Sequence, residues 1–294
     1  MSVSISPNPK TGILWMLLTM FLFVSMDATA KLLTQSMHVT QVVWGRYFFH
    51  LLILLLLLAP RLRSLATTRH IGIQLARSLL LLLTTASFFT GLTFIPMADA
   101  SSIMLVSPIV VTALSMPVLK EKVGPRRWAS VIVGCLGALI IIRPGFGVMQ
   151  SAAFFPLAAA IMYGMFQIST RLLSHTEPVL TNLLYSALIG TILTSLVVPF
   201  FWTSPSPREW LMMIGMGILG GLGHFALIKS LTISPAATVA PFTYSNLIWA
   251  TGFGYLIFGD VPDQWTVVGA SIIVISGLYI FHREQVKMRS DTPI

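Results

Sequence analysis

The feature that most constrains this chain is a series of apolar runs, each close to the length that crosses a lipid bilayer. A helix rises about 1.5 Å per residue, so a spanning helix needs roughly 20 mostly apolar residues. Ten runs of this kind occur. They lie at about 12–34, 41–59, 73–94, 98–119, 128–143, 151–173, 180–202, 209–230, 236–258 and 264–282.

Composition indicates that lipid, rather than water, surrounds these runs. Charged residues make up 9% of the chain, whereas a soluble domain carries about 25% and needs them for its water-facing surface. Strands of a membrane barrel would alternate polar and apolar residues, and the segment 51–59 shows no such alternation. The sequence therefore predicts an all-α membrane protein with ten transmembrane helices.

The first run has a second interpretation, as a signal peptide that is cleaved after Ala28-Thr29-Ala30. However, Asp27 and Lys31 interrupt the apolar pattern, and the run continues past Ala30. A membrane helix is therefore the favoured interpretation of this run.

The positions of Lys and Arg predict the orientation in the membrane, because cytoplasmic loops are rich in these residues. With a cytoplasmic amino terminus, thirteen of them fall on the cytoplasmic side and two, Arg143 and Arg208, on the other. Both termini are therefore expected in the cytoplasm and the protein in the cytoplasmic (inner) membrane. The same distribution accounts for the net charge of +9 without a nucleic-acid partner.

The two halves of the chain resemble each other. Pro125-Arg126-Arg127-Trp128 opens the fifth run and Pro262-Asp263-Gln264-Trp265 opens the tenth, each after an acidic residue, Glu121 or Asp260. Short breaks at 60–63, 120–122, 143–145, 204–207 and 259–262 make neighbouring helices antiparallel. Because five is an odd number, a second five-helix copy must be inverted, as in many secondary transporters. The predicted repeats are residues 1–143 and 144–294.

The ends of both halves resemble those of EamA repeats, which occur in the drug/metabolite transporter superfamily. In the second half this applies to 256–265 followed by Gly269 and Gly277, and in the first half to 119–145, where Ser130 corresponds to Gly269. The resemblance covers nearly the whole chain. It implies ten helices, cytoplasmic termini and a cavity formed mainly by the third, fourth, eighth and ninth helices, with contributions from the first and sixth. Similar members include exporters of amino acids, among them aromatic ones, and importers of riboflavin or adenosylmethionine.

Three charged residues lie inside apolar runs at similar depth. Asp27 and Lys31 are four residues apart and share a helix face, and Arg46 belongs to the second run. Charges inside a membrane usually face the bundle interior or water. Two interpretations stay open: a cluster for a substrate carboxylate or proton coupling, and a structural set whose charges neutralise one another. Lys31 has the further alternative of reaching the outer interface.

Other polar residues in the runs have weaker signals. Arg77 is expected to extend its side chain to the interface, as Arg commonly does. His50 and His224 could both titrate near neutral pH. His224 is selected as a cavity residue because glycines surround it, and His50 is expected to be an ordinary hydrogen-bonded residue.

The sequence between Gly215 and Gly220 matches G-x-G-x-x-G but does not indicate dinucleotide binding. That motif needs a preceding strand and an opening helix, whereas these glycines lie within an apolar span. Gly217 and Gly221 instead form a G-x-x-x-G face, which allows helices to pack closely.

The remaining candidates lie in the fourth, sixth and ninth runs. Pro108 and Pro241 occupy the fourth and ninth, which correspond by the internal symmetry, and are predicted to kink these helices for gating or to shape the cavity. Together with His224, the predicted substrate-binding residues are Tyr163, Gln167, Tyr244, Asn246 and Trp249. Some of them are expected to be packing residues only. A mostly apolar pocket with a few polar groups suits a small amphipathic substrate.

These observations predict a secondary transporter for small organic metabolites, specifically an amino-acid exporter that works by alternating access. The alternative is an uptake carrier for a vitamin or nucleoside-like metabolite, such as riboflavin or adenosylmethionine. A membrane-embedded enzyme is less favoured, because neither H-E-x-x-H nor G-x-S-x-G occurs. No catalytic residue, metal or cofactor is expected, and with Cys135 as its one cysteine the chain has neither an internal disulfide nor a multi-cysteine zinc site. The expected partners are a small-molecule substrate and the lipid bilayer; the sequence predicts no oligomeric state.

Overall fold

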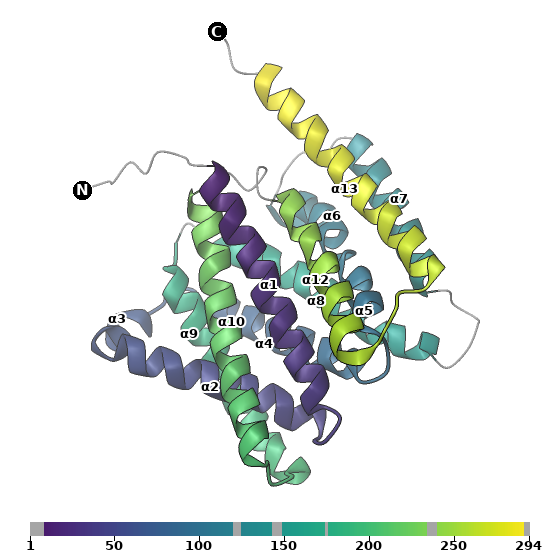
Figure 1. Ribbon diagram of the computed structural model, residues 1–294. Helices are drawn as coiled ribbons and strands as arrows, with labels where there is room; N and C mark the ends of the chain where they lie inside the picture. Colours follow the sequence, from purple (N-terminus) through teal and green to yellow (C-terminus); the bar gives the residue numbers. More distant parts are fainter. Residues whose placement is uncertain (1–8, 120–124, 143–148, 174–175, 234–239, 291–294) are drawn as a thin grey trace.

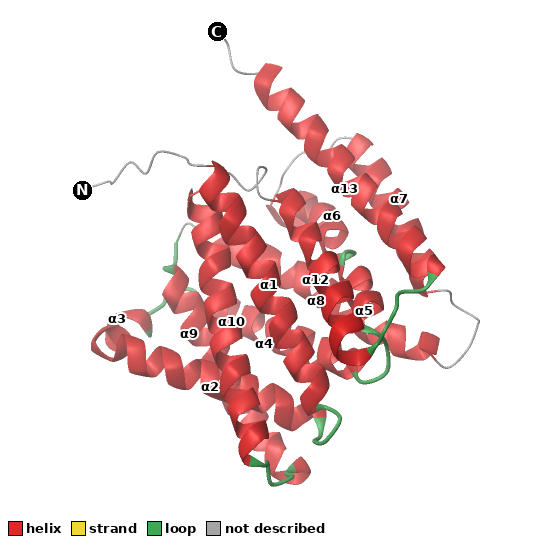
Figure 2. Ribbon diagram, in the orientation of Figure 1, coloured by secondary structure: helices red, strands yellow, loops and turns green. Residues whose placement is uncertain are grey.

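The computed structural model describes residues 9–119, 125–142, 149–173, 176–233 and 240–290. Within these ranges the chain is built from helices joined by short connections, without a β-strand (Figure 2). The predicted all-helical class is confirmed for this part of the chain. The predicted breaks at 120–122 and 143–145, the start of the ninth run and both chain ends lie outside the described residues.

Six helices are long and apolar enough to cross a membrane, and three belong to each half of the chain. They are α1 (Pro9–Leu33), α2 (Val39–Leu58), α4 (Ile71–Leu92), α8 (Met149–Leu173), α9 (Val179–Val197) and α10 (Pro207–Ile233). Short turns extend two of them: η1 (Ala59–Arg61) and α3 (Leu62–Leu65) follow α2, and η2 (Val198–Phe201) follows α9. These six helices correspond to the first three predicted runs of each half.

The fourth and ninth predicted runs are interrupted helices. The fourth consists of α5 (Met97–Met104) and α6 (Ser107–Leu119), and the ninth of η3 (Ala240–Tyr244), α12 (Ser245–Phe253) and the π-helical turn η4 (Gly254–Phe258).

Pro108 explains the interruption of the fourth run. Proline has no N–H, and its ring clashes with the carbonyl four residues earlier, so α5 ends at Met104 and the chain turns through Leu105 and Val106. Regular bonding resumes when the N–H groups of Ile109 and Val110 both donate to the Val106 carbonyl, at 2.9 and 3.2 Å.

The last helix of each half packs against its counterpart. α7 (Pro125–Ile142) and α13 (Gln264–Ser290) lie side by side (Figure 1). Their apolar parts are short. The two backbones approach closely at Gly137 and Gly269. A Cβ on Gly137 would lie 2.9 Å from the Gly269 carbonyl oxygen, and one on Gly269 would lie 2.5 Å from the Gly137 carbonyl oxygen.

Contacts between the halves come in matched pairs. α1 packs on α10, as α4 packs on α8; α2 packs on α10, as α9 packs on α4; and α1 packs on α12, as α8 packs on α5. By their order in each half, α1 corresponds to α8, α2 to α9, α4 to α10 and α5 to α12. When every helix is replaced by its counterpart, the first contact of each pair becomes the second. α1 begins and α13 ends toward the same end of the bundle (Figure 1).

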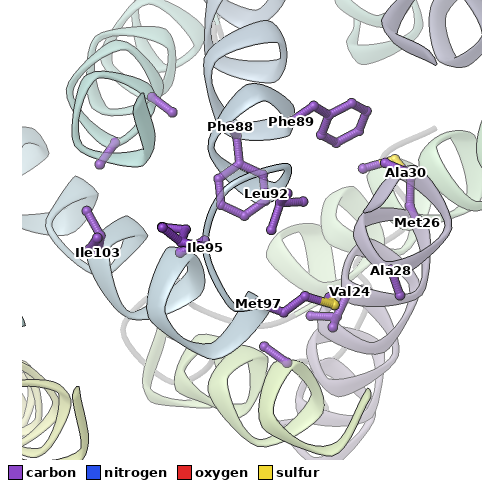
Figure 3. Packing of buried hydrophobic residues seen from close by; sticks show 14 of the residues in the cluster. Val24, Met26, Ala28, Ala30, Phe88, Phe89, Leu92, Ile95, Met97 and Ile103 are labelled. Carbon is purple, nitrogen blue, oxygen red and sulfur yellow. The ribbon is translucent and has the colours of Figure 1, made fainter. Parts of the chain in front are cut away.

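The interior and exterior of the bundle are both apolar. Side chains of α1, α4 and α5, among them Met26, Phe88 and Met97, converge in the largest buried cluster (Figure 3). On the outside, Leu57 and Leu256 are 73% and 77% exposed. A soluble protein rarely exposes apolar side chains over a large area, so this exterior suits lipid.

Glycines allow α10 to approach α2, as predicted from the G-x-x-x-G face. A Cβ on Gly217 would lie 2.5 Å from Phe49 Cβ and 2.9 Å from the His50 backbone nitrogen. A Cβ on Gly221 would lie 3.4 Å from His50 Cδ2. The prediction that this face permits close packing is therefore confirmed.

We expect Gly217→Ala to lower the melting temperature of the purified protein in detergent, because overpacking a tight contact costs about 1–3 kcal/mol. Gly215→Ala is the matched control, since it lies on the same helix and an added Cβ would meet no atom within 4 Å. Equal melting temperatures for the two variants would show that α10 and α2 do not pack closely at Gly217.

Candidate functional site

A cluster of polar side chains lies in the interior of the bundle. Asp27 comes from α1, Arg46 and His50 from α2, Thr85 from α4 and His224 from α10. Asp27 and Arg46 are only 9% and 7% exposed. Lipid cannot solvate such groups, so apolar helices turn them toward one another.

Arg46 is held by contacts to α4 and to its own helix. Its Nη1 donates to Thr85 Oγ1, and its guanidinium lies 5.1 Å from the Tyr47 ring centre and 5.9 Å from that of Phe89. The Thr85 hydroxyl donates its single proton to the Leu81 carbonyl at 2.9 Å, so Tyr47 Oη is the donor in its 3.1 Å contact with Thr85. Since a guanidinium has five N–H donors, Thr85 satisfies only one of them.

Asp27 lies in the electrostatic field of Arg46, and Tyr163 of α8 lies in the field of both charges. Within the described residues, the Asp27 carboxylate accepts no hydrogen bond and forms no direct ion pair with Arg46. The hydrogen-bonding capacity of the Asp27 carboxylate and of the Arg46 guanidinium is thus largely unused by the described residues.

Two histidines adjoin these charges. The rings of His50 and His224 stack with their centres 6.2 Å apart. His224 Nδ1 lies 2.8 Å from the Gly220 carbonyl oxygen, which requires Nδ1 to carry a proton, and the Phe23 ring packs edge-on against His224 at 4.9 Å. His50 is buried, and its Nε2 has no hydrogen-bond partner among the described residues.

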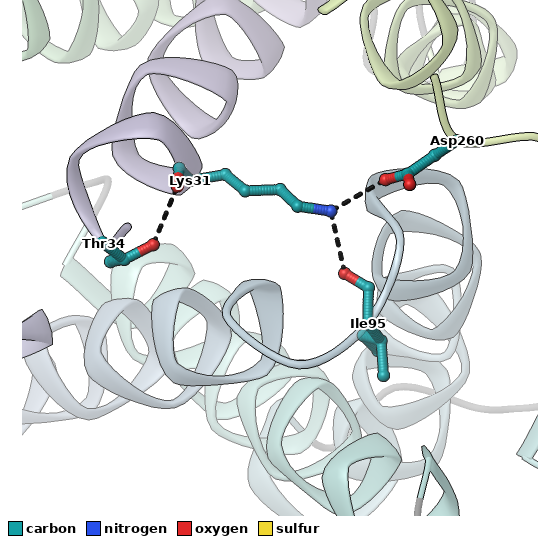
Figure 4. A network of polar contacts seen from close by, with 4 residues as sticks. All are labelled: Lys31, Thr34, Ile95 and Asp260. Atoms are coloured by element: carbon teal, nitrogen blue, oxygen red, sulfur yellow. Dashed lines mark hydrogen bonds and ion pairs between the residues drawn. The ribbon is translucent and has the colours of Figure 1, made fainter. Parts of the chain in front are cut away.

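Lys31 does not join Asp27 and Arg46. Its Nζ lies 2.8 Å from Asp260 Oδ2 and 3.2 Å from the Ile95 carbonyl oxygen (Figure 4), and 4.8 Å from the Phe258 ring centre. Lys31 is one helical turn beyond Asp27, where α1 ends close to the α4–α5 connection and to the loop after η4. The predicted three-residue cluster therefore divides into a central pair and an ion pair that joins the two halves of the chain.

The other candidate residues differ in how deeply they are buried. Tyr163 is half-buried near the central charges and stacks on Phe166, with ring centres 5.7 Å apart. Gln167, Tyr244 and Asn246 are also half-buried. In contrast, Trp249 is 36% exposed and packs edge-on against Phe21 of α1 at 5.3 Å. Pro241 lies in the turn η3.

The prediction that Arg77 reaches the interface is wrong. Arg77 is only 3% exposed. Its Nε donates to Thr170 Oγ1 of α8 at 2.7 Å, and its Nη1 donates to the Asn182 carbonyl and Ser186 Oγ of α9 at 2.9 and 3.0 Å. Acceptors on two neighbouring helices make burial favourable, and they cannot be identified from the third run alone.

Sequence reasoning also undervalued His50 and missed Thr85 and Asp260 as partners of charged residues. One signal for His50 was present, because it follows Arg46 by four residues and so shares its helix face. Thr85 carried no comparable signal, since a hydroxyl in an apolar helix usually bonds only to its own backbone.

Comparison with known proteins relates this fold to membrane transporters. A family model described as the EamA-like transporter family matches residues 10–143 and 150–281. A crystal structure of a protein 15% identical in sequence has a TM-score of 0.65 and covers 94% of this chain and 99% of the other. That likeness shows the fold alone.

Curated relatives are similar over almost their whole length. The S-adenosylmethionine uptake transporter of Rickettsia prowazekii is 28% identical over 95% of both chains. The riboflavin transporter of Vibrio cholerae is 28% identical over 99% of this chain and 100% of its own. The pseudopaline exporter of Pseudomonas aeruginosa is 26% identical over 91% of this chain and 94% of its own.

None of these three relatives is named as an amino-acid exporter, so that expectation stays a prediction. The resemblance to EamA repeats is confirmed, because the family model matches both halves separately. The chain is a multi-pass membrane transporter and belongs to the EamA-like transporter family.

Proposed function

We propose that the protein is a secondary transporter of the cytoplasmic membrane that moves a small organic metabolite by alternating access. The observation that carries this proposal is the interior cluster of Arg46, His50, Thr85 and His224 with Phe23, to which α1, α2 and α4 of the first half and α10 of the second half contribute side chains in contact with one another. A site between two halves of a transporter is exposed alternately when one half rocks against the other.

The architecture in this proposal is ten transmembrane helices in two inverted halves, residues 1–143 and 144–294. The matched contacts between the halves and the interruption of both the fourth and the ninth run support it. Interrupted helices are tolerated at membrane depth where they line a cavity or are buried in protein. Pro108 and Pro241 are the proposed gating or kink positions.

The proposed substrate site combines the central charges Asp27 and Arg46 with residues of α8, α10, η3 and α12. These residues are Tyr163, Gln167, His224, Tyr244, Asn246 and Trp249. Two forms of the proposal are supported by the relatives and the resemblance: uptake of a metabolite such as S-adenosylmethionine or riboflavin, and export of an amino acid or an amino-acid derivative.

We expect proteoliposomes preloaded with an unlabelled substrate to accumulate the labelled compound by counterflow. The test panel is S-adenosylmethionine, riboflavin, L-tryptophan and L-methionine, with protein-free liposomes as the control. A carrier exchanges at least one of these compounds without chemical change. Absence of exchange across the panel, or conversion of a compound into product, would contradict the proposal.

The Lys31–Asp260 pair is expected to separate during the transport cycle, since it joins α1 of the first half to the second half at one end of the bundle. Lys31→Cys and Asp260→Cys, combined in a Cys135→Ala background, allow these positions to be joined by a short bifunctional thiol reagent. We expect the cross-link to stop counterflow and a reductant to restore it.

The matched control for this experiment is Lys31→Cys with Thr34→Cys in the same background. It removes the same lysine but places the cross-link within the first half, so we expect transport to persist. Unchanged transport with the Lys31–Asp260 positions cross-linked would mean that the halves do not separate there.

Both chain ends are proposed to be cytoplasmic, in accordance with the excess of Lys and Arg on that side. We expect a reporter that is active only outside the cytoplasm to stay silent when it is fused after Ile294. The control is the same reporter fused after Ser206, between α9 and α10, where activity is expected. An active fusion at Ile294 would require an odd number of spans and would contradict the inverted repeat.

A further inference from the structure

A second buried polar network joins the two halves of the chain near the start of α4, and the proposed transport site does not use it. Arg77 of α4 bonds to Thr170, Asn182 and Ser186 on α8 and α9. Gln74, also on α4 and fully buried, donates from Nε2 to Asn182 Oδ1 at 2.6 Å. Both donors belong to the first half, and all of these bonds end on the second half. These five residues are called the Arg77 network below.

The loop that leads into α4 adds further bonds between the halves at the same end. The buried Glu177 carboxylate accepts a hydrogen bond from Thr68 Oγ1 at 2.6 Å and another from the Arg69 backbone nitrogen at 3.2 Å. Tyr185 Oη donates to the Ala66 carbonyl oxygen at 2.7 Å. The start of α4 is therefore bound to the second half both inside the bundle and at its edge.

Three levels can be distinguished along α4 and the turn that follows it. Arg77 marks the first level, and Thr85 of the central cluster follows it by eight residues, or about 12 Å of helix. The third level is the Ile95 carbonyl, which accepts a hydrogen bond from Lys31 of the Lys31–Asp260 pair. The central cluster thus lies between two contacts that join the halves, one toward each end of α4.

We infer that the Arg77 network is the cytoplasmic gate of the transporter and that it opens and closes in opposition to the Lys31–Asp260 pair. In the orientation proposed above, α4 begins on the cytoplasmic side, and the Lys31–Asp260 pair lies toward the outside. The inference rests on the proposed function, because alternating access opens one end of a central site while the other end is closed. Both contacts are made at once in this structure, as expected for a state in which the site is occluded.

The chemistry of the network suits a contact that opens to water. Burying an arginine costs solvation free energy, and apolar side chains often stabilise a permanently buried contact better. In the closed gate Arg77 has three oxygen acceptors and lies 4.6 Å from the Phe166 ring centre. When the halves separate, water can replace each acceptor with a small net change in free energy, whereas an apolar side chain would be exposed at a cost.

Two hydroxyl groups offer a way to weaken the closed gate alone. Thr170 Oγ1 donates to the Phe166 carbonyl at 2.8 Å and Ser186 Oγ to the Asn182 carbonyl at 3.0 Å, so both accept from Arg77. Thr170→Val/Ser186→Ala therefore removes two acceptors of Arg77 in the closed state. The variant leaves the hydration of Arg77 in the open state unchanged, so it favours opening.

Opening is measured by the reactivity of single cysteines in a Cys135→Ala background. Leu81→Cys lies between the Arg77 network and Thr85, because positions 77, 81 and 85 follow one face of α4. Leu92→Cys lies beyond Thr85, toward the other contact. Both leucines are buried. A membrane-impermeant maleimide is added from the cytoplasmic side in inverted vesicles for Leu81→Cys, and from the outer side in right-side-out vesicles for Leu92→Cys.

We expect Thr170→Val/Ser186→Ala to raise the labelling rate at Leu81→Cys roughly 5- to 30-fold, as expected for the loss of hydrogen bonds to a charged group. The rate at Leu92→Cys should fall, since a larger open population on one side leaves a smaller one on the other. Asp260→Asn, which weakens the other contact, should have the opposite effects on the two rates.

The matched control is Ser169→Ala/Thr194→Val. These hydroxyls lie on the same two helices and donate to the Met165 and Gly190 carbonyls at 2.9 and 2.6 Å. The control therefore also loses one serine and one threonine hydroxyl with their bonds inside the helix, but no bond to Arg77. We expect both labelling rates to equal those of the parent protein.

If the double variant fails to fold, Tyr185→Phe removes only the bond to Ala66 and should raise labelling at Leu81→Cys roughly 2- to 10-fold. Rates that match the control, or that rise together at both reporter positions, would make the Arg77 network a structural contact and overturn the inference. A wild-type protein that exchanges no compound by counterflow would contradict the proposed function itself. Exchange without any shift in labelling would overturn the gate alone.

Discussion

The hydrocarbon of a bilayer offers no hydrogen bonds, and this constraint shapes every level of the structure. Backbone groups are satisfied within helices, and hydroxyl side chains bond back to the carbonyl four residues earlier, as in Thr19, Thr84 and Ser102. Charged side chains find partners on other helices, as Arg77 does on α8 and α9. The polar atoms that stay without partners are therefore informative, because the chain satisfies the others so consistently.

The same constraint applies to the interface between the halves, where the contacts come in matched pairs. Each helix of one half meets helices of the other, so the interior is a shared surface and not the core of either half. The central charges belong to that shared surface, and the Lys31–Asp260 pair lies where α1 ends. Separating the halves therefore involves polar groups at the centre of the interface and an ion pair toward its end, as well as apolar packing.

The helices and the family were predictable because their signals are local. Apolar length fixed α1, α2 and α4 within a few residues, and the repeated Pro and Trp positions near the ends of the halves carried the resemblance. Partners of charged residues were not predictable. Lys31 and Asp260 are 229 positions apart, and the acceptors of Arg77 depend on how three helices pack. A kink at Pro108 was predictable, because proline disrupts regular helical hydrogen bonding. Its role in transport was not predictable, because that role depends on motions that no sequence pattern encodes.

The contact between Gly137 and Gly269 has a consequence for how such proteins can be recombined. Each glycine faces the carbonyl of the other, so a side chain at either position would push α7 and α13 apart. The two positions are therefore constrained together although they lie in different halves. A chimera that joins the first half of this chain to the second half of a relative should assemble only if the relative also has a residue without a side chain opposite Gly137. The compatibility of the halves is thus decided at a single pair of backbone positions as much as by the extended apolar surface around them.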